Sequence, residues 1–176
     1  FANPNPYTWT FRALLTAMDA WVKEGKEPPP SQYPRISAGQ LTTLAEVKFP
    51  KIPGVAVPAI MHLAYPENFG PQFRTKGIPT QEPPEIGKPY PVLVPQVDQD
   101  GNDLAGVHMP EIAVPLATYT GWNLRSSDIG APDQLATQVG SFIPFAKSKA
   151  ERMKTGDPRL SIEERYAGKE DYLRKF

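Results

Sequence analysis

The chain has 176 residues, and its 19 lysines and arginines balance 19 aspartates and glutamates, so the formal net charge is zero. That length suits a single domain, and the balance of charge provides no basic surface for nucleic acid or an anionic membrane. The absence of cysteine excludes disulfides and thiolate metal sites, and no apolar run approaches the roughly 20 residues of a transmembrane segment.

A long amphipathic helix is predicted near the N-terminus. Asn5 can cap the first free amides, and Pro6 is tolerated at the first helical position. Gly25 is the natural end of the helix, and the prolines that begin at Pro28 prevent its continuation. Apolar residues recur between these limits at helical spacing: Phe11, Leu14, Leu15, Met18 and Val22. We expect this face to be left largely uncovered by the chain itself.

Proline is the outlier of the composition. There are 22 prolines, more than twice the usual share of about 5%, and most of them lie between Pro28 and Pro115. Large apolar residues are spread through the same stretch, which distinguishes it from a flexible linker. Residues 28–89 are therefore expected to form an ordered, extended segment that wraps another surface.

A β-hairpin is predicted in the second half of the chain. Asp100-Gly101 lies between two apolar runs, which is a strong short-range hairpin signal. We expect Val92–Val97 to pair with Leu104–Met109, with residues 98–103 at the tip. Because both faces of the first run are largely apolar, the hairpin should be covered on both sides.

The tip also has a partial likeness to a calcium loop. Asp98, Asp100 and Asn102 stand at alternate positions, but the sixth position is Asp103 rather than glycine and the twelfth is Met109 rather than glutamate. A hairpin turn explains these residues equally well.

Only two histidines are available for acid–base chemistry. His108 lies near Asp98 and Asp103 in sequence, so a carboxylate could orient it as a base, although an exposed strand histidine is the simpler interpretation. His62 has apolar neighbours in sequence and is expected to be half-buried.

Short helices are predicted to close the chain. One is expected over residues 144–154, ended by Gly156. The Ser161-x-x-Glu164 pattern is a capping box for a second, and a third begins near Lys169.

The stretch after the hairpin holds the candidate binding residues. Tyr119 and Trp122 offer flat rings with polar tips, and Asn123 and Arg125 can orient a carboxylate, a carbonyl or a sugar hydroxyl. Together with Thr120 they form the candidate substrate-binding set. The alternative is a structural anchor whose polar atoms satisfy irregular backbone.

Four segments resemble a bacterial family of alpha/beta-hydrolase-domain proteins. They span most of the chain and occur in the order of the family: Ala13–Val22, Val97–Ala105, Pro115–Arg125 and Gly156–Tyr166. The resemblance implies the part of a serine hydrolase that follows its catalytic core, with the nucleophile and the histidine base upstream of Phe1. In agreement, none of the serines has the Gly-x-Ser-x-Gly setting of a nucleophile elbow. No catalytic residue is therefore assigned to this chain.

The expected fold class is an α+β fragment of a parent α/β hydrolase. Its parts are a helix that packs on the hydrolase core (1–27), the Pro-rich wrapping segment (28–89), the hairpin together with the family-like segment Pro115–Arg125, here called the signature stretch (90–125), and the C-terminal helices (126–176). The expected partners are the remainder of the parent polypeptide and a small ester or amide, with no metal or other cofactor and, by resemblance, a periplasmic or secreted location. The alternative function is a non-catalytic interaction or carbohydrate-binding module that uses Tyr119 and Trp122.

Overall fold

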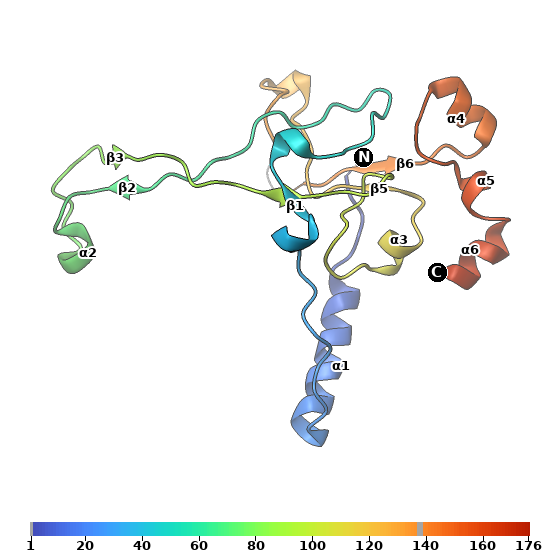
Figure 1. Cartoon of the computed structure of the whole chain (residues 1–176), viewed down its shortest axis with the longest axis horizontal. Coiled ribbons are helices and arrows are strands. Elements are labelled where there is room, and N and C mark those ends of the chain that lie inside the picture. Colours follow the sequence, from blue (N-terminus) through green and yellow to red (C-terminus); the bar gives the residue numbers. More distant parts are fainter. Residues whose placement is uncertain (1, 137–138) are drawn as a thin grey trace.

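Two long projections extend from a small central body. The computed structural model describes residues 2–136 and 139–176. Helix α1 projects in one direction, and an arm that carries β2, α2 and β3 projects in another (Figure 1). The helices are α1 (Thr8–Glu24), α2 (Phe73–Lys76), α3 (Pro110–Ala113), α4 (Lys149–Thr155), α5 (Ile162–Arg165) and α6 (Lys169–Lys175), with 3-10 turns η1 (Ile36–Ala38), η2 (Leu44–Glu46) and η3 (Ser127–Ile129). The strands are β1 (Leu41–Thr42), β2 (Glu67–Asn68), β3 (Glu85–Ile86), β4 (Val94–Pro95), β5 (Ala117–Tyr119) and β6 (Phe142–Pro144).

Helix α1 ends where predicted but begins two residues later than expected. Gly25 adopts φ 68°, and its N–H donates to the carbonyl of Trp21, which is the left-handed ending that favours glycine. The predicted cap by Asn5 is wrong, because the residue before the helix is Tyr7 and no side chain caps it. Asn3 instead accepts a hydrogen bond from the N–H of Asn5 and ties this segment to the central body by donating to the carbonyl of Thr120.

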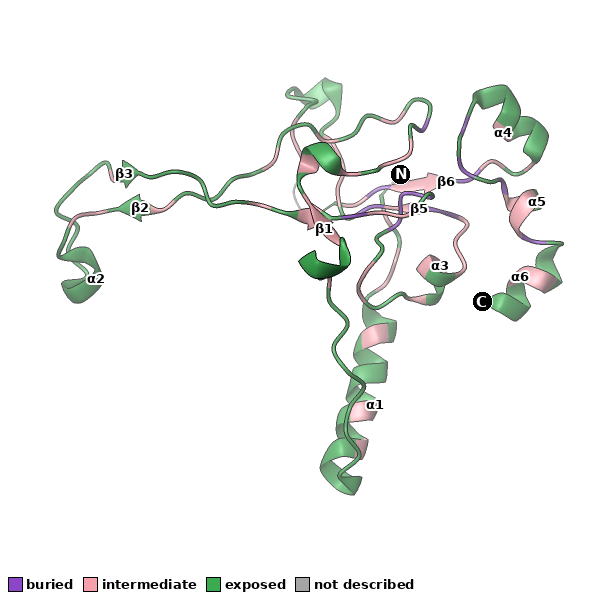
Figure 2. Ribbon diagram, in the orientation of Figure 1, coloured by how far each residue is buried: buried purple, intermediate pink, exposed green. Residues whose placement is uncertain are grey.

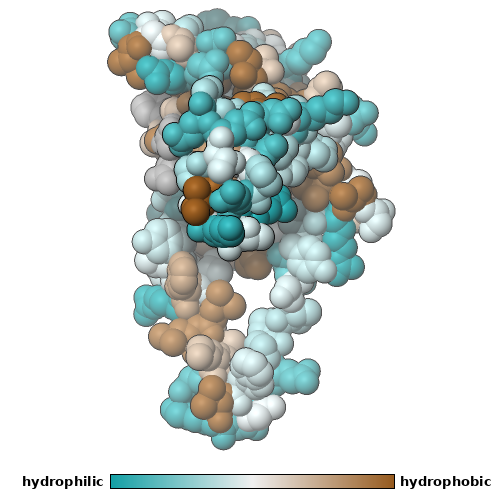
Figure 3. Space-filling model, turned by 90° about the vertical axis from the view of Figure 1, so that its left-hand side faces the viewer, coloured by the Kyte–Doolittle hydropathy of each residue, from teal (hydrophilic) through white to brown (hydrophobic). Residues whose placement is uncertain are grey.

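The apolar face of α1 is uncovered, as predicted. Phe11 is 64% exposed, Leu15 68% and Met18 57%, and α1 is green over most of its length in Figure 2. We use "apolar face of α1" for the residues that fall within a sector of about 120° when projected at 100° per residue. These residues are Tyr7, Phe11, Leu14, Leu15, Met18, Trp21 and Val22, all of them exposed. Figure 3 shows apolar side chains gathered along this lower projection.

The arm is a narrow two-stranded ribbon. Strands β2 and β3 pair antiparallel, and the N–H of Tyr90 donates to the carbonyl of Ala64 nearer the central body. Apolar side chains on and beside the arm are exposed, among them Tyr65, Phe73, Ile86 and Tyr90. An isolated two-stranded ribbon is marginally stable in water, and the wrapping role expected of residues 28–89 stays a prediction.

The predicted hairpin tip is confirmed, but the predicted strand pairing is largely wrong. Val97 bridges Asp103 antiparallel, and the N–H of Leu104 donates to the carbonyl of Gln96. Beyond this point the first run pairs with β1, as Leu41 with Pro95 and Thr42 with Val94. Leu93 and Val107 are exposed, so the hairpin is not covered on both sides. The predicted pairing fails because Pro95 has no N–H to donate to a ladder. The returning run, residues 104–109, forms no strand and leads into α3.

The centre of the body is polar rather than apolar. Strands β5 and β6 pair antiparallel, with Thr118 opposite Ile143. In the described part of the chain, the buried apolar side chains are Ile52, Ala117, Phe145 and Tyr166, whereas nine polar or charged residues are buried. Hydrogen bonds and ion pairs therefore carry much of the organisation that an apolar core supplies in an ordinary domain.

The C-terminal helices follow the predicted order. Ser161 and Glu164 form the predicted capping box of α5, Gly156 ends α4, and α6 begins at Lys169. The first of these helices starts later than predicted, because residues 142–144 are used by β6 and Ser148 caps α4 by accepting from the N–H of Glu151. No helix in the described part of the chain is both long and apolar enough to span a membrane.

Candidate functional site

The candidate binding residues begin at Tyr119, the last residue of β5, and continue into a turn held by several hydrogen bonds. The N–H of Ser141 donates to Oγ1 of Thr120 at 3.0 Å. Oγ of Ser141 donates to the carbonyl of Trp122 at 2.9 Å, and Oγ1 of Thr120 donates to the same carbonyl. Thr120 is thus buried and engaged within the protein, and its observed contacts organise the turn.

The two candidate aromatic rings pack on different partners. The ring of Tyr119 lies 5.4 Å from that of Phe142, and the ring of Trp122 meets Phe49 edge-on at 5.5 Å. Both residues are half-buried, and burial raises the pKa of the Tyr119 hydroxyl above its usual value. Tyr119 therefore stays a neutral hydrogen-bonding group at ordinary pH.

The two remaining candidates differ in how far they are engaged. Arg125 donates from Nε to the carbonyl of Gly130 and from Nη2 to that of Ile129, so it closes the loop around η3. The carbonyl of Asn123 accepts from the N–H of Ala136 at 2.8 Å, and the residue is half-buried. The substrate-binding role of the five residues remains a prediction. Thr120 is buried, whereas Tyr119, Trp122 and Asn123 are half-buried and Arg125 is exposed but bonded to the loop around η3.

Asn102 positions Tyr119, and sequence reasoning did not identify this role. Its side chain is fully buried. Nδ2 donates to the carbonyl of Ala117, and Oδ1 accepts from the N–H of Tyr119 at 2.8 Å. The side chain of Asn102 therefore bonds the backbone of β5 much as a neighbouring strand would, and it fixes the hairpin tip to this strand. The composition of the turn indicated a tip but could not show which strand its asparagine would meet.

Two acidic side chains of the tip, those of Asp98 and Asp100, are already bonded within the protein. Oδ1 of Asp98 accepts from the N–H groups of Asp100 and Asn102, and the carboxylate of Asp100 pairs with the guanidinium of Arg165, at 2.7 Å from Nη1. These contacts support the hairpin interpretation over the calcium loop, because a calcium ion would have to displace a buried arginine and two backbone amides.

We expect calcium to leave the stability of the chain unchanged for this reason. Adding millimolar calcium should shift the midpoint of thermal unfolding by less than about 1 °C, as measured by circular dichroism against an EDTA-treated sample. A saturable rise in the midpoint with calcium, absent with magnesium, would show that the turn is an ion site.

A second buried ion pair lies beneath β5 and β6. Arg159 is 3% exposed and pairs with Asp157 at 2.6 Å. Burial by itself raises the pKa of Asp157, but the hydrogen bonds from Arg159 outweigh it and hold that pKa below its usual value. The ring of Phe145 lies under the guanidinium groups of both Arg159 and Arg165. The C-terminal segment is thereby anchored to the strands.

Glu164 makes the stability of this anchor depend on pH. Hydrogen bonds from Arg152 and Ser161 lower the pKa of Glu164 from 4.5 to about 2. Because the pKa of Glu164 is lower in the folded state than in the unfolded state, the ionised carboxylate stabilises the folded state. This stabilisation is fully present above about pH 4.5 and is lost as the pH falls toward 2. Urea unfolding between pH 2 and 6 should show this loss, and the Glu164→Gln variant should show a flatter profile. Equal slopes in the two proteins would contradict the assignment.

Neither histidine is placed as an oriented base. His108 is exposed. Burial raises the pKa of neighbouring Asp103, and the positive charge of His108 only partly opposes this shift. His62 was predicted to be half-buried and is in fact exposed, because the extended segment around it leaves the central body toward the arm. Within residues 2–136 and 139–176, no three acidic or histidine side chains gather as metal ligands.

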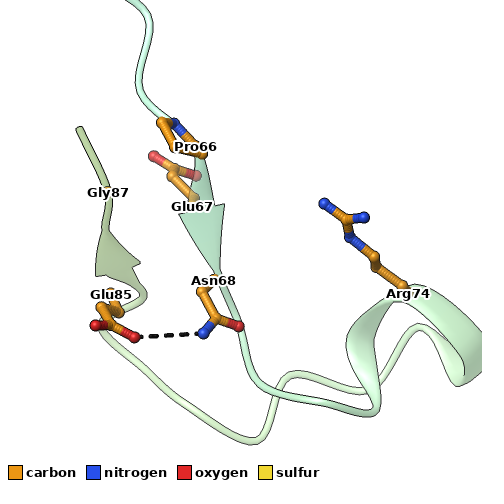
Figure 4. A pocket seen from close by; sticks show the side chains of 6 residues that line it. All are labelled: Pro66, Glu67, Asn68, Arg74, Glu85 and Gly87. Carbon is orange, nitrogen blue, oxygen red and sulfur yellow. Dashed lines mark hydrogen bonds between the residues drawn. The ribbon is translucent and has the colours of Figure 1, made fainter. Parts of the chain in front are cut away.

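The arm holds a separate open cleft of about 380 Å³. Figure 4 shows its lining residues, with Asn68 donating to Glu85 across β2 and β3 and Arg74 facing them from α2. Carboxylates and a guanidinium face one another here. None of the lining residues belongs to the turn that holds the candidate binding residues, Tyr119–Arg125, which we call the signature turn.

The comparisons with known proteins agree with the segments that suggested a family. A family model described as "Alpha/beta hydrolase domain" matches residues 2–176. No curated protein and no solved structure matches the chain. The matched range includes α1, the arm, the hairpin tip, the signature turn and the C-terminal helices. By this match over nearly its whole length, the chain belongs to the alpha/beta hydrolase domain family.

Proposed function

We propose that residues 1–176 form the part of a serine hydrolase that covers the catalytic core and shapes its substrate pocket, with a small ester or amide as substrate. The observation that carries this proposal is the size of the uncovered surface. The chain exposes 12,820 Å², whereas a compact monomer of 19.5 kDa exposes about 8,500 Å². The excess is roughly 4,000 Å², well above the approximately 800 Å² that each partner buries in a standard interface.

The uncovered surface is concentrated on elements that project from the body. The apolar face of α1 is exposed, and the arm presents further apolar side chains on a ribbon too thin to cover them. A body that fills the space beside both projections would bury them together. A domain-sized core of the same enzyme fits that requirement better than a small ligand or a transient partner does.

The side chains of this chain support a binding role and not the chemical step. The sequence holds no nucleophile elbow, and both histidines are exposed. In the proposed enzyme, the serine and its base belong to the covered core. The Tyr119, Trp122 and Asn123 side chains supply an aromatic and hydrogen-bonding wall to the pocket. A free-standing carbohydrate-binding module is disfavoured, because it would have to cover its own apolar face.

Labelling with a fluorophosphonate tests this proposal. The chain alone is expected to remain unlabelled, because no serine is placed to become a nucleophile. The complete enzyme should be labelled at one serine within a Gly-x-Ser-x-Gly sequence outside residues 1–176. Stoichiometric labelling of any serine in the chain alone would refute the proposed division of labour.

A further inference from the structure

Arg159 joins both members of one residue pair in the β5–β6 ladder. Its Nη1 donates to Oγ1 of Thr118 at 2.8 Å and to the carbonyl of Ile143 at 2.9 Å, and these two residues are opposite each other in the ladder. Nη2 adds a bond to the carbonyl of Pro144 at 3.2 Å. The guanidinium thus contacts both strands of the β5–β6 pair at the same position of the ladder.

Thr118 extends this contact to the hairpin tip. Its hydroxyl accepts from Arg159 and donates to the carbonyl of Asp100, and the side chain is fully buried. A buried hydroxyl that both donates and accepts has one arrangement that satisfies it. Arg159 is itself oriented by Asp157, whose Oδ1 accepts from the Arg159 Nε at 3.0 Å.

The ladder leads directly into the signature turn. Strand β5 ends at Tyr119 and is followed by Thr120, and Ser141 precedes β6. Thr120 and Ser141 both donate to the carbonyl of Trp122. A slip between the strands would separate these two donors, and the turn would lose the contacts that hold the carbonyl of Trp122 in place.

We propose that Arg159 is a positioning residue: by holding Thr118 and Ile143 in register, it sets where Trp122 and Asn123 lie in the substrate pocket. This inference rests on the proposed function for the role of the pocket. The coupling from Arg159 to Trp122 is independent of any substrate and can be measured on the chain itself. Failure of hydrolase activity and failure of the coupling are therefore separate outcomes.

The experiment uses Trp122 as the reporter. Trp9 and Trp21 are exposed on α1, and replacing both with phenylalanine leaves Trp122 as the single tryptophan. In this background, Arg159→Lys keeps the charge facing Asp157 but cannot reach all three strand acceptors. Acrylamide quenching of Trp122 is expected to rise by about twofold through local opening. The matched control is Arg152→Lys, which alters the neighbouring pair with Glu164 and should leave the quenching unchanged.

A second variant keeps the test decisive if Arg159→Lys does not fold. Thr118→Val removes the hydroxyl but preserves the shape of the side chain, and it should raise the quenching of Trp122 in the same direction. In the complete hydrolase, Arg159→Lys should raise KM by about tenfold with little change in kcat, the pattern of a lost binding geometry. Quenching in the Arg159→Lys or Thr118→Val variant that equals that of Arg152→Lys would overturn the coupling. An unchanged KM alongside raised quenching would overturn the pocket role alone.

Discussion

Replacing Asp100 with alanine is expected to destabilise the folded chain by about 3–5 kcal/mol, because it leaves the guanidinium of Arg165 without its carboxylate. The side chains of Asp100 and Arg165 are 8% and 12% exposed, and Arg165 also lies 4.1 Å from the ring centre of Phe145. A loss of this size approaches the whole stability of a marginal domain. Urea unfolding followed by circular dichroism measures it.

The pair between Asp19 and Lys23 provides the control for this prediction. It has a similar distance, 2.9 Å, but its side chains are 59% and 69% exposed. Exposed ion pairs contribute little to the stability of the folded state, because water screens the charges. Asp19→Ala should therefore change the free energy of unfolding by less than about 0.5 kcal/mol. If the two substitutions have equal effects, the buried pair does not carry the anchoring role.

Replacing Leu15 and Met18 with lysine is expected to have opposite consequences in the chain alone and in the complete enzyme. In the chain alone both side chains are exposed, so stability should be unaffected, and association through the apolar face of α1 should fall. In the enzyme the same face is proposed to be buried, where each apolar side chain contributes about 1.5–3 kcal/mol. The double variant should therefore separate the core from this part or unfold the enzyme.

The opposite face of α1 supplies a matched control. Ala13 and Thr16 are exposed and project away from the apolar face, so their replacement with lysine adds the same charge without removing apolar contact. Light scattering of the chain and thermal unfolding of the enzyme give the two measurements. Ala13→Lys with Thr16→Lys should leave both unchanged. If these substitutions destabilise the enzyme as strongly as the Leu15 and Met18 pair, the face of α1 that meets the core has been assigned wrongly.

Local elements of this protein were predictable because their determinants lie within a few residues of one another. Gly25 ends α1 because a left-handed residue is required there, and Ser161 with Glu164 closes the capping box of α5 across three positions. The tip around Asp100-Gly101 follows from turn chemistry in the same way. Helical spacing alone places the apolar side chains of α1 on one face, and the resemblance to a hydrolase family, which implies a core outside this chain, was the reason to expect that face to be uncovered.

The tertiary structure alone decided which distant segments meet. The pairing of Val94 with Thr42 replaced the expected pairing within the hairpin, and nothing in the local sequence of either strand indicates this partner. Arg165 reaches Asp100 across 65 positions, and Arg159 reaches Thr118 across 41. No local pattern marks an arginine as one that will be buried against a strand rather than solvated. That choice depends on the backbone carbonyls and carboxylates that folding brings around it, so the anchor beneath the signature turn became visible only in three dimensions.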